Sequence, residues 1–458
     1  MGAGGSLRLL VDFFSLASNE GNKNAVAVGL AVTAALLVCT LIVTFYDVVG
    51  ERIPRAGETA LFALLTAVAY GGGQYIMLGF AKRINKDLGS RSAFFNLMYK
   101  VTVITQYVLM VILAVIVLQM IFFSHFLLFL VIAATAISAA PSGVLNAYMG
   151  YSILSWYRMD KRNVMLLLLG TAGIMAAIPS AGSAVVIQMQ LMEAPAEIVA
   201  AGSDSSPPGM LGALFTLLVA LPLFIAALAE WGGIALMLRH FSRNIGRLKY
   251  WTLISLPLLM LLAGILPALL AAISSSRFSL YEGEFLSYRV LTVIGAVVFA
   301  VFVMGFAFQR MAKKVRQIHK GSVVEDYMVI ASFGLVMLAI ANLAPVQRIT
   351  FPPFGLSAHS FVALSTYLAS IGIYSSAITV FDDTKLRQSI RKFAVKELTY
   401  LDSIGVAYME QEIVNRAVKM AQEYSEDSGG RPQLLPTEDQ LKQYLNDVLD
   451  EIHKKKKD

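Results

Sequence analysis

Residues 351–392 read FPPFGLSAHSFVALSTYLASIGIYSSAITVFDDTKLRQSIRK, and they contain the last long apolar run of the chain together with the first strongly charged run after it. An apolar run of about 20 residues is long enough to cross the hydrocarbon core of a bilayer as a helix. Upstream of this stretch the chain is a succession of similar runs, whereas downstream it is polar. The stretch therefore predicts a final membrane helix that leads into a cytosolic tail.

The composition of the whole chain indicates the same environment. Of its 458 residues, 57% are hydrophobic and 15% are charged, whereas soluble globular proteins carry about 25% charged residues. The lipid bilayer is therefore the expected partner of most of the chain. The net charge of +7 is explained by basic loops on one side of a membrane, so no nucleic acid partner is expected.

Ten apolar runs are long enough to be spans, which predicts an all-α, polytopic transmembrane helical bundle. They lie at about 25–46, 59–80, 101–123, 126–153, 164–187, 211–238, 251–273, 290–311, 327–344 and 358–381. Several of them contain helix-weakening residues, among them Pro141, Pro179 and Pro222. Such breaks line substrate sites in transporters, but they are also common in membrane helices of any function.

The basic residues in alternate loops predict the orientation of the bundle. The loops at 82–100, 158–162, 239–249 and 313–320 hold 16 Lys and Arg residues, whereas the loops on the opposite side hold 5. Basic loops remain in the cytoplasm. Both termini of this integral membrane protein are therefore expected in the cytoplasm, and the membrane is expected to be the plasma membrane.

The chain divides into five predicted segments. Residues 1–23 form an interfacial segment, and residues 24–381 form the transmembrane domain. Residues 382–424 continue the last span as an amphipathic tail helix, 425–436 are a linker, and 437–458 form a C-terminal amphipathic helix. The apolar faces of the two tail helices predict a cytosolic protein partner or homo-oligomerisation through the tail.

No motif in the sequence indicates catalysis. The chain lacks a Walker-type GxxxxGK[ST] loop, an HExxH pair and a nucleophile elbow, and its five histidines are scattered. We therefore expect no enzyme activity, no cofactor and no metal site.

Polar residues inside the apolar runs are the candidate intramembrane functional residues. Glu230 is the sharpest of them, because a carboxylate inside a span is costly and marks a functional site by default. The alternative is a structural ion pair or a position near the cytoplasmic interface. Gln74, Asn146 and Asn342 are further candidates, although amides in spans, including Gln106 and Gln119, more often bond to a neighbouring helix.

The last span carries a stripe of small residues and ends in a basic cluster. The stripe consists of Ser365, Ala369, Gly372, Ser376 and Thr379 at helical spacing, and small residues allow close helix packing in lipid. The stripe predicts either tight packing alone or a coupling helix that moves as a rigid rod. Lys385, Arg387, Arg391 and Lys392 beyond it are candidates for contact with anionic lipid.

Three short motifs near the end of the chain carry a resemblance. PPFG at 352–355, GIYSSA at 372–377, and Asp383 followed by LRQSIRK at 386–392 resemble an uncharacterised family of archaeal multi-pass membrane proteins. The resemblance covers the last fifth of the chain. It implies an archaeal membrane protein and assigns neither an activity nor site residues.

Three functions are compatible with this pattern, and the first of them is the preferred prediction. The uninterrupted last span and tail favour a sensor or signalling adaptor that passes a membrane or extracellular state to the tail. The broken spans and Glu230 favour a secondary transporter or channel for a small solute or ion. A structural subunit of a membrane complex is the third alternative.

Overall fold

The computed structural model describes residues 55–67, 74, 77–79, 81–82, 85, 93–123, 126–159, 161, 163–192, 210–239, 246, 250–262, 282–318, 323–343 and 355–382. The predicted interfacial segment, the first predicted span and all predictions for the tail beyond residue 382 lie outside these residues.

Most of the described residues are helical, and none of them lies in a strand. The helices are α3 (Arg55–Ala67), α5 (Ala93–Phe123), α6 (Leu128–Met159), α7 (Val164–Met192), α8 (Met210–Arg239), α11 (Glu282–Ile318), α12 (Val323–Leu343), α13 (Gly355–His359) and α14 (Val362–Asp382). A further apolar helical segment covers Tyr250–Leu262. Helices are expected in lipid because they satisfy their backbone hydrogen bonds internally.

Six of these helical segments are long and apolar enough to cross a membrane, which makes the chain a multi-pass membrane protein. They are Ala93–Phe123, Phe129–Arg158, Leu221–Arg239, Gly295–Arg316, Val323–Asn342 and Gly355–Val380. The helical bundle is thereby confirmed in the described part of the chain, whereas ten spans and the positions of the termini stay predictions. The prolines Pro141, Pro179 and Pro222 lie inside α6, α7 and α8, which continue past them.

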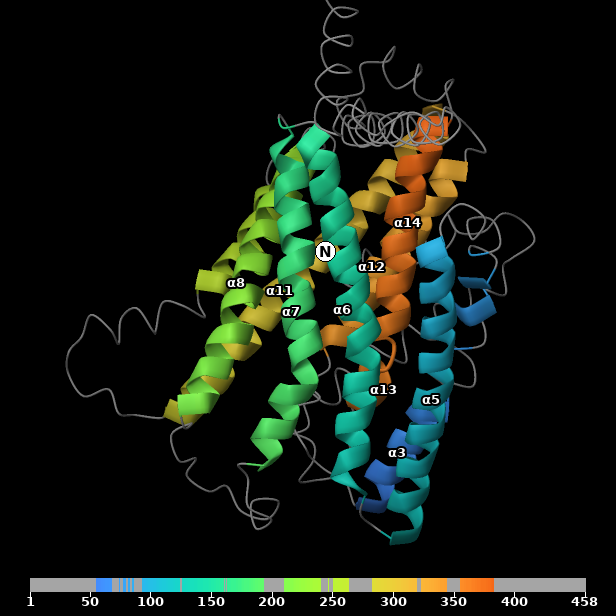
Figure 1. Ribbon diagram of the computed structural model, residues 1–458, viewed down its shortest axis with the longest axis vertical. Helices are drawn as coiled ribbons and strands as arrows, with labels where there is room; N and C mark the ends of the chain where they lie inside the picture. Colours follow the sequence, from blue (N-terminus) through green and yellow to red (C-terminus); the bar gives the residue numbers. More distant parts are fainter. Residues whose placement is uncertain are drawn as a thin grey trace, which may run out of the picture.

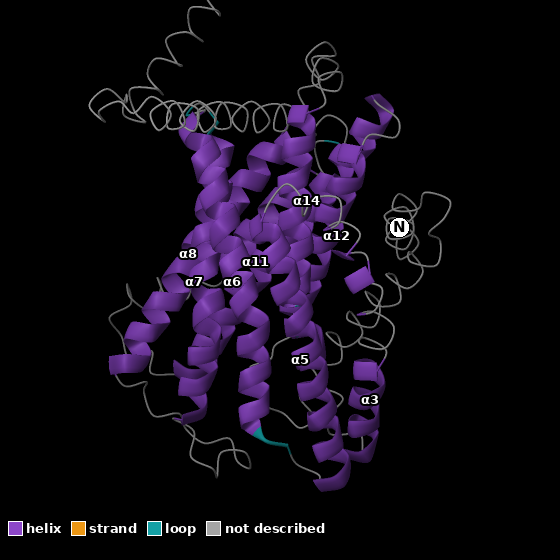
Figure 2. Cartoon of the chain, turned by 45° about the vertical axis from the view of Figure 1, so that its right-hand side comes forward, coloured by secondary structure: helices purple, strands orange, loops and turns teal. Residues whose placement is uncertain are grey.

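The helices form two layers (Figure 1). Helices α5, α6, α7 and α8 lie side by side in chain order, and α11, α12 and α14 lie behind them. Contacts between α8 and α11 close one edge of the pair of layers, and contacts of α14 with α5 and α6 close the other. Figure 2 shows the same bundle from a second direction, with α3 beside α5.

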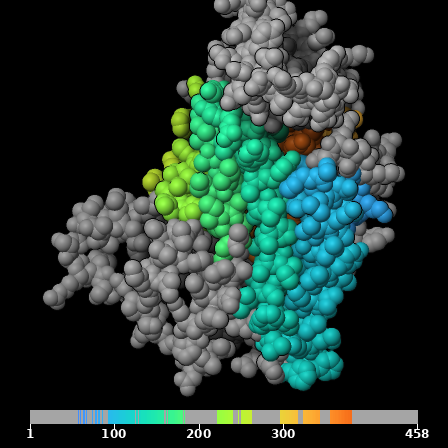
Figure 3. Space-filling model, in the orientation of Figure 1, coloured from blue at the N-terminus to red at the C-terminus, as the bar shows by residue number. Residues whose placement is uncertain are grey.

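Helix α5 has one face buried in the bundle and one exposed apolar face. Phe95, Leu109 and Leu113 are buried, whereas Val111 and Phe122 are exposed at 62% and 73%. In a membrane protein such exposed apolar side chains face lipid rather than water. Figure 3 shows α5 and α6 side by side on one face of the molecule.

Glycines bring two pairs of helices, α6 with α7 and α12 with α14, into close contact. A Cβ atom on Gly150 of α6 would lie 2.6 Å from the backbone nitrogen of Ile174 in α7. A Cβ on Gly334 of α12 would meet the backbone of Ala369 in α14, and one on Gly372 would lie 2.8 Å from the carbonyl oxygen of Tyr327. Close approach of backbones at small residues is the usual packing mode of membrane helices. These close contacts pack α7 against α6 and α14 against α12.

Candidate functional site

The last span is interrupted near its beginning. Helix α13 ends at His359 and α14 begins at Val362, with Ser360 and Phe361 in a turn between them. The amide of Ser360 donates to the carbonyl of Leu356 (3.0 Å), and the amide of Phe361 donates to that of Ala358 (3.1 Å). The structure thus differs from the prediction of one uninterrupted helix from residue 358.

Side chains of two other helices satisfy the carbonyl groups at this break. The Gln106 Nε2 of α5 donates to the carbonyl of Ser360 (3.0 Å), and the Ser138 hydroxyl of α6 donates to that of His359 (2.8 Å). A backbone carbonyl without a partner costs several kcal/mol in hydrocarbon. These two bonds therefore make the interruption possible inside the bundle.

A third polar contact lies one turn further along α14. The Ser142 and Thr366 hydroxyl oxygens are 2.8 Å apart, and Thr366 also donates to the carbonyl of Val362 (2.8 Å). Since a hydroxyl has one proton to donate, Ser142 is the donor to Thr366. Ser142 follows Pro141, so α6 contributes its polar residues around its own proline.

Three buried polar atoms at the same helix contact have no hydrogen-bond partner among the described residues. They are the Thr102 Oγ1 and Gln106 Oε1 of α5 and the Tyr367 hydroxyl of α14. We call Thr102, Gln106, Ser360 and Tyr367 the polar seam. Its members are hydroxyl, amide and carbonyl groups, so the seam can form hydrogen bonds without carrying a charge.

Aromatic side chains lie beyond the polar seam in the direction of the end of α14. The ring centroids of Tyr99 and Tyr367 are 6.1 Å apart, and those of Phe95 and Tyr374 are 4.8 Å apart. Trp156 stacks on Tyr374 at 6.2 Å. These rings lie between the break and the end of α14 along the last span.

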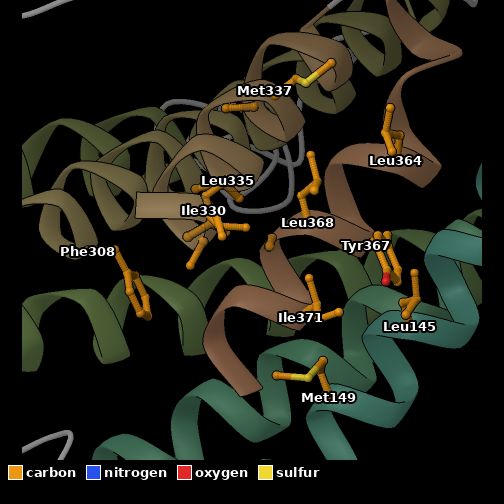
Figure 4. Packing of buried hydrophobic residues seen from close by; sticks show 14 of the residues in the cluster. Leu145, Met149, Phe308, Ile330, Leu335, Met337, Leu364, Tyr367, Leu368 and Ile371 are labelled. Atoms are coloured by element: carbon orange, nitrogen blue, oxygen red, sulfur yellow. The ribbon is translucent and has the colours of Figure 1, made fainter. Parts of the chain in front are cut away.

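The two sides of α14 differ in chemistry. Figure 4 shows Tyr367 beside Leu145 of α6, whereas Leu368 lies on the side of Leu335 in α12. The small-residue stripe is about half a turn round the helix from Tyr367, and its members Ala369 and Gly372 contact α12. The other stripe residues make only local contacts or lie half-buried. The Ser365 hydroxyl donates to the carbonyl of Phe361, the Ser376 hydroxyl donates to that of Ile373, and Thr379 is half-buried.

Glu230 is not part of the polar seam. It is 9% exposed on α8, and α8 packs on α7 and α11. The neighbouring Gly232 and Gly233 face the leucines Leu168 and Leu169 of α7. Glu230 forms no hydrogen bond or ion pair with the described part of the chain.

The three candidate amides also lie apart from one another. Gln74 is 3% exposed, and neither atom of its amide has a partner within the described ranges. Asn146 is half-buried on α6, and its carbonyl oxygen would lie 3.2 Å from a Cβ on Gly173. Asn342 donates to the carbonyl of Leu338 in its own helix (3.0 Å). The proposed lipid contacts Lys385, Arg387, Arg391 and Lys392 lie outside the described residues.

The sequence did not single out the residues that the fold brings to the break. Ser138, Ser142 and Thr366 are ordinary small polar residues of apolar runs, and Gln106 stood out only as an amide inside a span. Two hydroxyls flanking Pro141 are a signal that would have pointed to α6. No group of residues that could hold a metal ion occurs in the described ranges.

Comparison with known proteins gives no relative of this chain. No protein family, no curated protein and no solved structure matches it. Function must therefore be argued from the arrangement of its own residues.

Proposed function

We propose that this membrane protein is a transporter or channel for a small solute, with its solute path at the break in the last span. The observation that carries the proposal is the interruption of the last span at Ser360 and Phe361. There the carbonyl of Ser360 accepts a hydrogen bond from a side chain of α5, and the carbonyl of His359 accepts one from a side chain of α6. Interrupted helices at membrane depth occur where they line a cavity or a binding site.

The hydrogen bonds at the break also support a moving part. A carbonyl held by the side chain of another helix is released when that helix shifts, whereas a carbonyl within a helix is held by its own turn. Gln106 and Ser138 come from two different helices, so a displacement of α5 or α6 would release one bond at a time. Helix α14 itself stays fixed to α12 at Gly334 and Gly372.

A reversible cross-link tests this proposal. The Ser142 and Thr366 oxygens are 2.8 Å apart, so cysteines at both positions should form a disulfide that joins α6 to α14 beside the break. The native Cys39 is first replaced by serine, because it is the one cysteine of the chain. Full-length protein in proteoliposomes is then assayed for uptake of glycerol, urea, glycine, Na⁺ and K⁺.

We expect flux of at least one solute, loss of that flux on oxidation and recovery on reduction. The single variants Ser142→Cys and Thr366→Cys, given the same oxidant, are the controls and should keep their flux. Full flux in the cross-linked protein would show that the break does not move during transport. Absence of flux for the whole panel in the uncross-linked protein would contradict the proposal.

A sensor remains the second candidate, because one observation favours it. The segment Gly355–Val380 is the most buried candidate span, at 89%, compared with 33% for Ala93–Phe123. A helix surrounded in this way transmits the state of its neighbours to whatever follows its end, which here is the predicted tail. A protein that carries no solute but loses its cellular role when residues 425–458 are deleted would support this alternative.

A further inference from the structure

The polar seam carries a second inference, which concerns the chemistry of the solute. Thr102 is 1% exposed, and Gln106 and Tyr367 are 0% exposed. Yet the Thr102 Oγ1, the Gln106 Oε1 and the Tyr367 hydroxyl all lack a partner among the described residues. Buried polar groups are almost always hydrogen-bonded. Each exception either lowers the stability of the fold or marks a place where water or another molecule binds.

The register of α5 against α14 places these three atoms along one line. Gln106 contacts Ser360, and Tyr99 contacts Tyr367. Tyr99 lies seven residues before Gln106 on α5, whereas Tyr367 lies seven residues after Ser360. The two helices are therefore antiparallel at this contact. Seven helical residues span about 10 Å, and Thr102 lies between the two contacts. The three unpartnered atoms therefore lie along one contact between α5 and α14, spread over about 10 Å.

The charges around the polar seam restrict what can bind there. Between Ala93 and Phe123 the single charged residue is Lys100, which is exposed, and α6 carries its one charged residue, Arg158, at its far end. Helix α13 and residues 362–381 of α14 contain no Asp, Glu, Lys or Arg. An ion at the seam would lose its hydration without gaining a counter-charge, which costs several kcal/mol.

The hydrogen-bonding capacity of the seam complements an uncharged solute. The Gln106 Oε1 accepts a hydrogen bond, and the Thr102 and Tyr367 hydroxyls each donate one and accept one. A polyol or a urea-like amide presents both donors and acceptors, so it can bond to these groups in succession as it moves along the contact between α5 and α14. We infer that the polar seam is a binding site for a small uncharged solute of this kind, and the inference rests on the transport function proposed above.

The break in the last span gives the solute a way in. All three atoms are buried in the conformation described here, so the seam is closed. Release of the Ser360 carbonyl by Gln106 would open the seam at its α13 end. The aromatic rings of Phe95, Tyr374 and Trp156 would keep the other end closed meanwhile.

Two conservative substitutions test the site. Thr102→Val and Tyr367→Phe remove one unpartnered hydroxyl each and preserve the shape of the side chain. Ser375→Ala is the matched control, because it also removes a buried, unpartnered hydroxyl, but two turns further along α14 than Tyr367. The readout is stopped-flow light scattering of proteoliposomes containing the full chain, after an osmotic gradient of glycerol or urea.

We expect Thr102→Val and Tyr367→Phe each to slow glycerol or urea entry about fivefold, which is the effect of losing one hydrogen bond to the solute. Ser375→Ala should leave entry unchanged. Thermal unfolding of all three variants should occur at or above the wild-type temperature, since each loses an unpartnered polar group. Slower entry without loss of stability separates a binding role from a structural one.

Other outcomes overturn the inference in distinguishable ways. Entry of glycerol or urea that neither variant alters would place the solute elsewhere and leave the transport function standing. Entry of Na⁺ or K⁺ alone would give the wrong class of solute, and entry of water alone would show that the seam holds water only. Absence of entry for every solute would contradict the proposed function itself.

Discussion

At the scale of single residues, Glu230 is the most unusual side chain of the described bundle. It is buried on α8 close to Gly233, which faces Leu169, and it forms no hydrogen bond or ion pair with the described residues. Glu230→Leu should raise the free energy of unfolding by about 1–3 kcal/mol, because it replaces the carboxyl group of a residue that is only 9% exposed with an apolar side chain of similar size. Thermal unfolding of the purified protein in detergent measures this change.

Glu325→Leu is the matched control for that substitution. Glu325 lies 3.6 Å from the Arg316 side chain, which is 56% exposed, and an ion pair with so exposed a partner contributes at most about 1 kcal/mol. Its removal should leave the unfolding temperature nearly unchanged. A fall in stability for Glu230→Leu would reveal a partner for the carboxylate, and unchanged stability with lost flux would assign Glu230 to the solute path.

Residue identity alone explains why Glu230 could be selected from the sequence and why the polar seam could not. A carboxylate inside an apolar run is visible without knowing any contact. Thr102 and Tyr367 are ordinary residues of membrane helices, and they become notable only because their hydroxyls find no partner. That property depends on the register between α5 and α14, two helices that lie some 250 residues apart in the chain, as the hydrogen bond from Gln106 to Ser360 shows.

At the scale of helices, the contact between α12 and α14 depends on the absence of side chains at two positions. A Cβ on Gly372 would lie 2.5 Å from the backbone nitrogen of Ala331, which is much closer than such atoms approach in folded proteins. Gly372→Ala should therefore separate the helices and lower the free energy of unfolding by about 1–3 kcal/mol. Thermal unfolding of the variant measures the loss.

Gly79→Ala provides the control for this prediction. Gly79 is helical and exposed, and nothing lies within 4 Å of the position that its Cβ would take. The substitution should be neutral or stabilise the protein by up to about 1 kcal/mol, because alanine favours helix over glycine. Equal stability of Gly372→Ala and Gly79→Ala would mean that α12 and α14 do not meet at this point.

The helices also show which breaks a sequence can predict. Pro141, Pro179 and Pro222 suggested weak points, yet α6, α7 and α8 continue through them, because neighbouring groups in a bundle can satisfy the carbonyl that a proline frees. The actual interruption falls at Ser360 and Phe361, where the sequence has neither proline nor glycine. It requires donors from Gln106 and Ser138, so it is a property of the packing rather than of the local sequence.

At the scale of the whole molecule, apolar run length was sufficient to predict a helical bundle, because a span must be helical in lipid whatever its neighbours are. The arrangement of the helices in two layers could not be predicted in this way. The helix faces are apolar nearly all round, so no periodicity indicates which side of a helix faces which neighbour. Glycine positions such as Gly150 and Gly334 carry that information, but it is readable only when their partners are known.

The orientation of the bundle gives the last prediction. The connection from α6 to α7 and the end of α14 lie at one end of the molecule, and the connection from α5 to α6 lies at the other (Figure 1). Helix α6 has 32 residues and is about 48 Å long, whereas the hydrocarbon core is about 30 Å thick. The two ends of α6 must therefore emerge on opposite sides of the membrane.

The exposed residues Leu127 and Lys161 lie near these two ends of α6. In the Cys39→Ser background, Leu127→Cys should react with a membrane-impermeant maleimide in intact cells. Lys161→Cys should react only after the membrane is permeabilised, because Arg158 and Lys161 belong to the basic loops for which the charge distribution predicts a cytoplasmic position. The reverse labelling pattern would show that the bundle has the opposite orientation, with the α13 end of the polar seam facing the cytoplasm. Solute would then reach the seam first from inside the cell.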